Sequence, residues 1–489
     1  MTAATALPGP APIVAPPEEI RRGSWRDTCA AAGGTVAAAV LLTAGGPVLL
    51  AGVGGLLVAL VSAVRRPHLI APVIVGGFTL QPAVKFFVTP LAGPAKDGVV
   101  VLALTVVGLC LLRGRRSSHL PDRTLLALLG VFVLTLAINP AGSHGPGWQF
   151  VTRLTIESFG LLLVPLLIGN PQRGWSWAAW SAVIVGLFES ALGVAQQFIG
   201  VTRLVTQVGY AYGDQVRQTS GGQLRSFGTL DDPFNYATLT LLSLVCALQV
   251  VRRPAARLLV TSALALGVVV SFDRTAFVLL ALVLALHLDT KGRRATALLM
   301  VAAVLLAGLA LLLVKPQATA PTTVPADGAP ASSSFLLSLN GRTATWLRVL
   351  RGPQDVLFGR GAGEIGAGLD RSQGKAVAVQ GRYQAGATAA ATSGLALTSL
   401  DSSYVEVLAD VGLVGLVVLL ATGARILGLL RASARGPGTP GAGGLAIFAV
   451  VALDGLTRTS LTAFPFGFVA LYLLGAALAA ARPTAPSPP

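Results

Sequence analysis

The chain has 489 residues, of which 53% are hydrophobic and only 11% are charged. This composition is too apolar for a soluble multidomain protein and indicates a polytopic membrane protein. The formal net charge of +16 would suggest a nucleic-acid partner in a soluble protein, but in a membrane protein the positions of the cations decide what they mean.

Apolar segments recur along the whole chain. A helix that crosses a bilayer needs roughly 20 apolar residues, and about 14 segments of this kind can be placed. Because 30–64 and 443–481 could each be divided differently, we expect an all-α protein with about 12 to 14 transmembrane helices. The predicted centres are Val36, Gly55, Phe78, Val106, Val131, Leu163, Val185, Leu242, Leu264, Leu280, Leu305, Leu416, Val450 and Leu473.

Basic residues concentrate in every second short loop, which predicts the orientation of the chain. The loops expected outside hold mostly single cations such as Lys96, Arg153 and Arg458. The net charge is therefore explained by topology and attraction to anionic lipid, and we expect no nucleic-acid partner. The loops expected inside carry Arg21, Arg22, Arg26, Arg65, Arg66, Arg113, Arg115, Arg116, Arg123, Arg173, Arg252, Arg253, Arg257, Lys291, Arg293, Arg294, Arg425, Arg431 and Arg435.

Two long outer loops divide the chain into sections. The three cysteines and four histidines are scattered, so we predict neither a disulfide framework nor a metal site. The predicted sections are a disordered cytoplasmic N-terminus (1–28), an N-terminal transmembrane bundle (29–199), an outer loop (200–232), central transmembrane helices (233–314), a large outer loop (315–400), C-terminal transmembrane helices (401–482) and a cytoplasmic tail (483–489).

The first outer loop ends in "QLRSFGTLDDPFNYATLTLL", which leads directly into a predicted span. Asp231, Asp232, Pro233 and Asn235 have the residue types that begin a helix. Ordinary helix-start chemistry is therefore an alternative to a binding role for these residues. It does not explain Arg225, which is expected just above the membrane.

A second outer arginine lies in "VVSFDRTAFVLL", between two spans that are joined almost without a loop. A cation at the edge of the bilayer is costly and usually has a partner or a function. The partner of Arg274 could be its neighbour Asp273, and the alternative is a functional role.

The large outer loop contains "SFLLSLNGRTATWLRVLRGPQDVLFGRGAG" between two segments of linker composition. Residues 339–351 have a helical pattern in which Arg342 flanks an apolar face that includes Trp346. Gly359 and Gly361 then allow a tight turn or a close approach to a ligand. A short amphipathic helix on the outer leaflet is the alternative.

The chain returns to the membrane through "LTSLDSSYVEVLADVGLVGLVVLL". Asp401 or Ser402 can cap the span that follows. Glu406 and Asp410 lie within it, and an apolar span seldom carries two carboxylates without a partner. Other spans contain Glu157, Glu189 and Asp454; for Glu157 and Asp454 we expect pairing with Arg153 or Arg458.

These pieces, taken in order, resemble the O-antigen ligase and polysaccharide polymerase superfamily. "RSFGTLDDPFNYA" resembles its Arg-x-x-Gly-Thr, Pro and Asn signature, and "FDRTAF" is similar to its Ser-Arg at the next outer span end. "NGRTATW" with "LFGRGAG" resembles its Arg-x-x-x-Trp and Gly-x-Gly. "DSSYVEVLADVGLVGL" resembles its His/Asp-Asn-x-Tyr segment and the helix that follows. The resemblance covers roughly 189–416.

The resemblance implies a GT-C-like, metal-independent glycosyltransferase without a cofactor. Such enzymes move a glycan from an undecaprenyl diphosphate donor to an acceptor at the outer face of the plasma (inner) membrane. It implies that Arg225, Arg274 and Arg342 meet at the diphosphate, since arginine binds phosphate through a permanently charged fork, and that Asp401 is the base. The implied substrate-binding residues are Trp346, Gly359, Gly361, Asp232, Asn235, Tyr404 and, on the acceptor path, Glu189.

At two positions the sequence departs from the ligase motif, and both bear on whether the reaction is ligation or polymerisation. The ligase branch places a histidine where this chain has Asp401, and Ser402 replaces the asparagine that follows. Both changes favour a polymerase, whose acceptor is another lipid-linked glycan, over a ligase. A lipid or polysaccharide transporter is the remaining alternative, but the sequence lacks the related halves expected of one. An exopolysaccharide or cell-wall glycan is the expected product, with chain-length or export proteins as candidate partners.

Overall fold

A computed structural model describes residues 62–87, 95–113, 122–139, 145–210, 215–219, 222–288, 346, 353–364, 402–434 and 438–481. Several predictions lie outside these residues: the N-terminal segment 1–28, the spans centred on Val36, Gly55 and Leu305, the tail 483–489, and the candidate residues Arg342 and Asp401. Of the predicted helix over 339–351, only Trp346 is described, and it is helical and half-buried.

The described chain is almost entirely helical. Eleven helices of 15 residues or more contain all eleven predicted span centres that fall in the described ranges. The elements are η2 (Pro67–Leu69), α3 (Ile70–Phe87), α4 (Ala95–Leu112), α5 (Arg123–Ile138), α6 (Pro146–Leu167), α7 (Pro171–Arg203), η4 (Leu204–Val208), β1 (Arg217–Gln218), β2 (Leu224–Arg225), α8 (Pro233–Val250), α9 (Pro254–Val270), α10 (Arg274–Leu288), α14 (Pro353–Phe358), α17 (Ser403–Ser433), α18 (Pro440–Asp454) and α19 (Phe466–Ala481).

Five of the helical segments are long and apolar enough to cross a membrane: Pro67–Phe87, Pro146–Leu167, Pro171–Val208, Pro233–Val250 and Ser403–Ser433. The prediction of an all-α polytopic membrane protein is confirmed. Helix starts follow the sequence signals, because α6, α7, α8, α9 and α18 each begin at a proline. The side chains of Asp122, Asn170, Asp232, Ser402 and Thr439 cap their helices.

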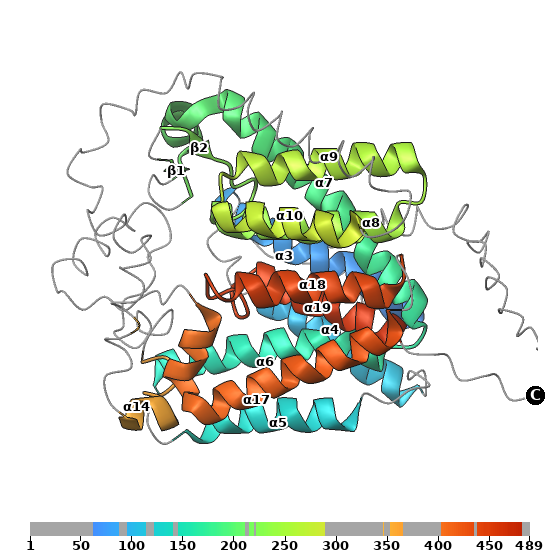
Figure 1. Ribbon diagram of the computed structural model, residues 1–489, viewed down its shortest axis with the longest axis vertical. Helices are drawn as coiled ribbons and strands as arrows, with labels where there is room; N and C mark the ends of the chain where they lie inside the picture. Colours follow the sequence, from blue (N-terminus) through green and yellow to red (C-terminus); the bar gives the residue numbers. More distant parts are fainter. Residues whose placement is uncertain are drawn as a thin grey trace, which may run out of the picture.

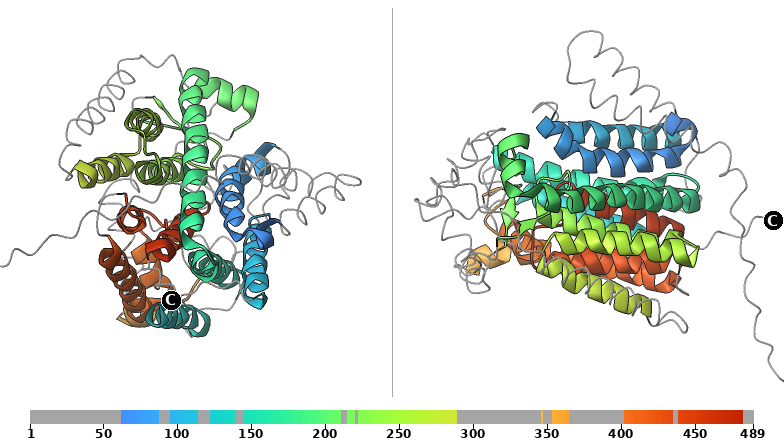
Figure 2. Two further views of the ribbon diagram at one scale, coloured as in Figure 1. Left: turned by 90° about the vertical axis from the view of Figure 1, so that its right-hand side faces the viewer. Right: turned by 90° about the horizontal axis from the view of Figure 1, so that it is seen from above.

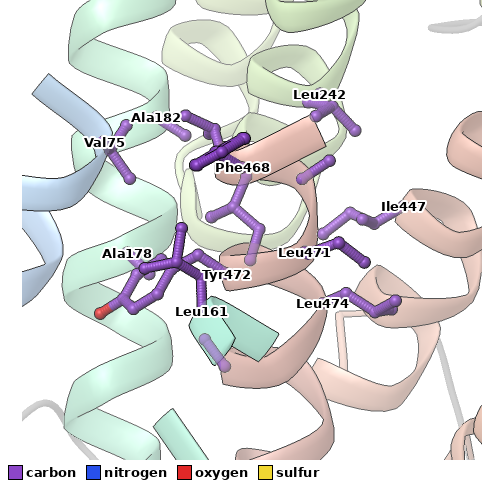
Figure 3. Close-up of a cluster of buried hydrophobic side chains, with 14 of the residues drawn as sticks. Val75, Leu161, Ala178, Ala182, Leu242, Ile447, Phe468, Leu471, Tyr472 and Leu474 are labelled. Carbon is purple, nitrogen blue, oxygen red and sulfur yellow. The ribbon is translucent and has the colours of Figure 1, made fainter. Parts of the chain in front are cut away.

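Helix α19 lies in the middle of the bundle. Every residue from Phe466 to Ala480 is buried, and α19 packs against α6, α7, α8 and α18. Figure 3 shows its Phe468, Leu471 and Tyr472 among side chains from α6, α7 and α8. The peripheral helices instead leave leucine and valine exposed, as Leu413 and Val417 of α17 do, which suits contact with lipid.

The charge pattern defines an outer end of each helix, meaning the end predicted to face away from the cytoplasm. In Figure 1, β1 and β2 lie at the upper left and α14 at the lower left, on the side where the outer ends of neighbouring helices also lie, and α7 runs obliquely across the bundle. In the left view of Figure 2, the same helix runs nearly vertically. A bend at Gly200, with φ of 79°, turns the outer end of α7 toward the loop that follows. The described parts of the two long outer loops therefore lie on one side of the bundle.

Candidate active site

Three guanidinium groups surround the ring of Phe234 at the outer start of α8. The guanidinium carbons of Arg217, Arg225 and Arg458 lie 5.5, 5.8 and 5.0 Å from the ring centroid. We call Arg217, Arg225 and Arg458 the arginine cluster. Arg217 and Arg225 are direct partners across the two-stranded sheet, where like charges are destabilising. Contact with an aromatic face offsets only part of that repulsion, so the cluster is suited to an anion.

Arg225 is the member of the cluster that the sequence predicted. Its Nε is buried and, among the described residues, has no hydrogen-bond partner. Burial lowers the pKa of Arg225 from its ordinary value, attraction by Asp273 raises it, and repulsion from Arg217 and Arg274 lowers it. A guanidinium stays protonated despite such shifts. Arg225 therefore holds a positive charge that no described carboxylate neutralises by an ion pair.

The alternative in which Asp273 is the partner of Arg274 has no support among the described ion pairs. Asp273 forms its ion pair with Arg458, and its Oδ1 accepts a hydrogen bond of 3.1 Å from the backbone N–H of Thr275. Arg458 also lies 3.0 Å from Asp454, which confirms the predicted pairing of those two residues. Arg274 is exposed and close enough to repel Arg225. The structure thus brings Arg225 and Arg274 into one region, while Arg342 lies outside the described residues.

Asp232 and Asn235 support the start of α8. The carboxylate of Asp232 accepts hydrogen bonds from the backbone N–H groups of Phe234 and Asn235 at 2.7 and 2.8 Å, and from the Asn235 amide at 2.6 Å. The helix-start interpretation is therefore confirmed. These bonds fix the turn that carries Phe234, and they favour a positioning role for Asp232 and Asn235.

The loop that carries Arg225 is bound by polar side chains of α7. Gln196 accepts hydrogen bonds from the backbone N–H groups of Phe227 and Gly228 at 3.0 and 2.9 Å, and donates one to the carbonyl of Gly228 at 2.7 Å. Gln197 donates to the Leu224 carbonyl at 2.9 Å and to Ser226 Oγ at 2.7 Å. A membrane-embedded helix face therefore fixes the backbone on both sides of Arg225.

Glu189 belongs to the same face of α7. Its side chain is fully buried, and its carboxylate accepts hydrogen bonds from the backbone N–H of Thr229 at 2.8 Å and from the Thr229 hydroxyl. The acceptor-path role that we expected of Glu189 has no support in this placement. The geometry favours a positioning role for Glu189 toward the Arg225 loop.

The glycine-rich loop after α14 packs against α17. Gly359 and Gly361 have φ of 75° and 101°, which confirms the predicted tight turn. A Cβ on Gly359 would lie 2.7 Å from the backbone of Asp410 and of Gly412, and the Arg360 N–H donates to the Ala409 carbonyl at 2.6 Å. Gly359 thus allows close approach to helix α17.

Asn139, at the outer end of α5, joins these same two segments. Its amide donates to the carbonyl of Phe358 at 2.9 Å and to the carbonyl of Asp410 at 2.7 Å. The α17 backbone bends here, since Gly412 has φ of 69° inside the helix. We call this junction of residues 358–360 with Asn139 and residues 409–412 the α17 clasp.

The start of α17 is bound to the loop between α18 and α19. The backbone N–H of Ser403 lies 2.8 Å from the carbonyls of Gly455 and Arg458, and its hydroxyl donates to the Arg458 carbonyl at 2.9 Å. The Tyr404 hydroxyl donates to the carbonyl of Ala452 at 2.9 Å, so its predicted contact with substrate lacks support. Ser402 caps the helix. The motif residues that follow Asp401 are therefore joined to the segment that carries Arg458.

Other predicted carboxylates have separate environments. Glu157 forms ion pairs with Lys96 at 3.0 Å and with Arg153 at 3.7 Å, which confirms the pairing with Arg153. Glu406 and Asp410 are buried and line a small cavity of about 30 Å³ between α5, α6 and α17, with no cationic side chain among its lining residues in the described part of the chain.

The sequence prediction missed Arg217, Phe234, Arg458, Gln196 and Gln197. The two glutamines had a usable signal, because Glu189, Gln196 and Gln197 are spaced to share one face of a helix inside an apolar span. Arg217 had none, since a strand of two residues is too short to show an alternating pattern.

The fold and the site define an integral membrane protein whose outer helix ends hold a cluster of arginines around an aromatic ring. Residues 237–420 match the family model described as O-Antigen ligase. This match supports the resemblance to the ligase and polymerase superfamily. No match was found among curated proteins. The matched residues include Arg274, Arg342 and Asp401, whereas the arginine cluster lies outside them.

Proposed function

We propose that the protein transfers a glycan from an undecaprenyl diphosphate donor to a glycan acceptor at the outer face of the inner membrane, and that it polymerises an exopolysaccharide or cell-wall polysaccharide. The observation that carries the proposal is the arginine cluster around Phe234. Exposed Arg274 lies nearby. A diphosphate at a membrane surface is an anion that Arg225, which forms no ion pair with a described carboxylate, would bind together with Arg274.

The chemistry requires charge stabilisation at the leaving group. The acceptor hydroxyl oxygen forms a bond to the anomeric carbon, the bond from that carbon to the diphosphate oxygen breaks, and the hydroxyl proton passes to a base. Negative charge develops on the diphosphate, and fixed cations in a partly dry site stabilise it strongly. In this proposal Arg225 and Arg274 bind the diphosphate, Arg342 joins them from the large loop, and undecaprenyl diphosphate is released.

A ligase that moves the glycan to a different acceptor is the second candidate. The family description favours it, because the matched domain is described as an O-antigen ligase. Aspartate at position 401, where the ligase branch has histidine, favours the polymerase. The two candidates share the donor site and differ only in the acceptor.

The decisive experiment is incubation of the purified full-length protein in lipid nanodiscs with a lipid diphosphate glycan, in the presence of EDTA. A polymerase gives a ladder of increasing chain length, whereas a ligase moves one glycan to a foreign acceptor. The arginine cations require no metal, so EDTA is expected to leave the rate unchanged. Loss of activity with EDTA would contradict the metal-independent mechanism, and absence of any glycan transfer would contradict the proposed function.

Replacement of Asp401 by asparagine is expected to reduce turnover by about 100- to 10,000-fold, the contribution of general base catalysis. Asparagine caps helices about as well as aspartate, so Asp401→Asn separates the two roles proposed for this residue. Initial rates measured on the same nanodisc preparation test the prediction. Unchanged turnover would remove Asp401 from the base role, and Ser402→Ala, which removes the observed cap, is the matched control for helix-start damage.

A further inference from the structure

Arg458 lies in the loop between α18 and α19, beyond the matched family domain. Its guanidinium is mostly buried, with a side chain 16% exposed, and it contacts three elements at once. It pairs with Asp273, at the α9 to α10 junction, and with Asp454, at the end of α18. It also lies over the ring of Phe234 on α8. Arg458 is therefore the only described cation that forms an ion pair with Asp273 or Asp454.

The charges around Arg458 explain what these ion pairs achieve. Asp273 and Asp454 bring two carboxylates to the region that holds Arg217, Arg225 and Arg274. Asp273 attracts Arg225, so without another partner its carboxylate would compete with any anionic ligand for that arginine. An arginine that is already paired with a buried carboxylate binds phosphate poorly, because the carboxylate neutralises its positive charge.

We propose that Arg458 is a positioning residue: it binds the carboxylates of Asp273 and Asp454 and thereby leaves Arg225 and Arg274 free to bind a diphosphate. The inference rests on the proposed function, because it assigns the role of one further residue at the donor site. It predicts that loss of the Arg458 side chain weakens diphosphate binding mainly because the freed carboxylate of Asp273 then competes for Arg225.

The backbone of Arg458 has a separate function that a substitution leaves intact. Its carbonyl accepts the hydrogen bonds from the N–H and hydroxyl of Ser403. A side-chain substitution therefore preserves the link between this loop and the start of α17. Asp273→Asn is equally conservative, since an asparagine oxygen can still accept the hydrogen bond from the Thr275 N–H.

The experiment measures binding of undecaprenyl diphosphate to the full-length protein in nanodiscs, together with thermal unfolding. The variants are Arg458→Gln, Asp273→Asn and the double variant, with Arg225→Gln as the reference for a lost donor site. Arg153→Gln is the matched control, because Arg153 is another outer arginine paired with a carboxylate and lies outside the arginine cluster.

Arg458→Gln is expected to weaken binding at least about 10-fold, and the double variant to restore the Kd to within about threefold of wild type, a coupling that a double-mutant cycle measures. Asp273→Asn alone is expected to bind as tightly as wild type or more tightly. Two results would overturn the inference: unchanged binding by Arg458→Gln, or a double variant no better than Arg458→Gln, which would place Arg458 itself on the diphosphate.

Two further measurements separate other causes. If Arg458→Gln does not fold, Arg458→Lys replaces it, because lysine keeps the charge without the bidentate guanidinium and is expected to give intermediate affinity for undecaprenyl diphosphate. Weakened binding by Asp273→Asn would then overturn the inference without reference to Arg458→Gln. If wild type does not bind undecaprenyl diphosphate and Arg225→Gln changes nothing, the proposed function fails instead. The two failures are therefore distinguishable.

Discussion

Replacement of Arg225 by glutamine is expected to reduce glycan transfer by about 100- to 1,000-fold, the cost of removing one fixed group that stabilises transition-state charge. The side chain is half-buried beside Phe234, with an Nε that has no hydrogen-bond partner among the described residues. Because no described carboxylate forms an ion pair with Arg225, its loss breaks no ion pair of the fold. The transfer rate should therefore fall while the thermal unfolding temperature of the same preparation stays near that of wild type.

Arg203→Gln is the matched control for Arg225→Gln. Arg203 is an exposed arginine at the outer end of α7, in the same outer region of the chain. We expect its substitution to leave the rate within about twofold of wild type, as for a surface charge remote from a site. Equal losses in the two variants would indicate a general effect of net charge, and full activity of Arg225→Gln would remove Arg225 from the site.

Replacement of Gly228 by alanine is expected to abolish transfer by displacing the Arg225 loop. Gly228 has φ of 60°, and a Cβ there would lie 2.0 Å from Oε2 of Glu189 and 2.9 Å from the ring of Tyr236. Both groups are fully buried, so neither can move away without disrupting the packing of the bundle. The loop must shift, and its hydrogen bonds with Gln196 and Glu189 are lost.

Gly222→Ala provides a control for the backbone conformation. Gly222 lies in the turn between β1 and β2 with φ of 80°, but a Cβ there meets nothing within 4 Å. Both substitutions carry the left-handed penalty of about 1–2 kcal/mol, and only Gly228→Ala adds a steric clash. Transfer rates and limited proteolysis compare the two variants. If Gly228→Ala and Gly222→Ala lose the same amount of activity, the clash with Glu189 does not cause the loss of transfer.

Much of the fold followed from hydrophobicity and charge. The predicted span centres fall inside observed helices because a helix in a bilayer must satisfy its own backbone hydrogen bonds. Long apolar runs therefore determine where the helices lie. The pairs Glu157 with Arg153 and Asp454 with Arg458 were also predictable, since both are four residues apart on one helix face or its immediate extension.

The site itself was only partly predictable. Arg225 and Arg274 were visible as cations at span ends, but the partner of Asp273 lies far along the chain, on Arg458. In the sequence, the neighbouring Arg274 was the visible candidate partner of Asp273. Tertiary packing instead brings the distant Arg458 to that carboxylate. Likewise, the glycine at 359 signalled a close approach, but the sequence could not reveal that the approaching group was the backbone of α17.

The α17 clasp has an entropic consequence for the large outer loop. Asn139 and the backbone of Ala409 hold residues 358–360 against α17. The loop predicted over 315–400 is thus attached to α5 and α17 near its middle. The closure cost of a loop rises by only about 0.6 kcal/mol per doubling of length, so the gain in stability is small. The clasp is therefore an attachment point for residues 358–360 on α5 and α17 more than a source of stability.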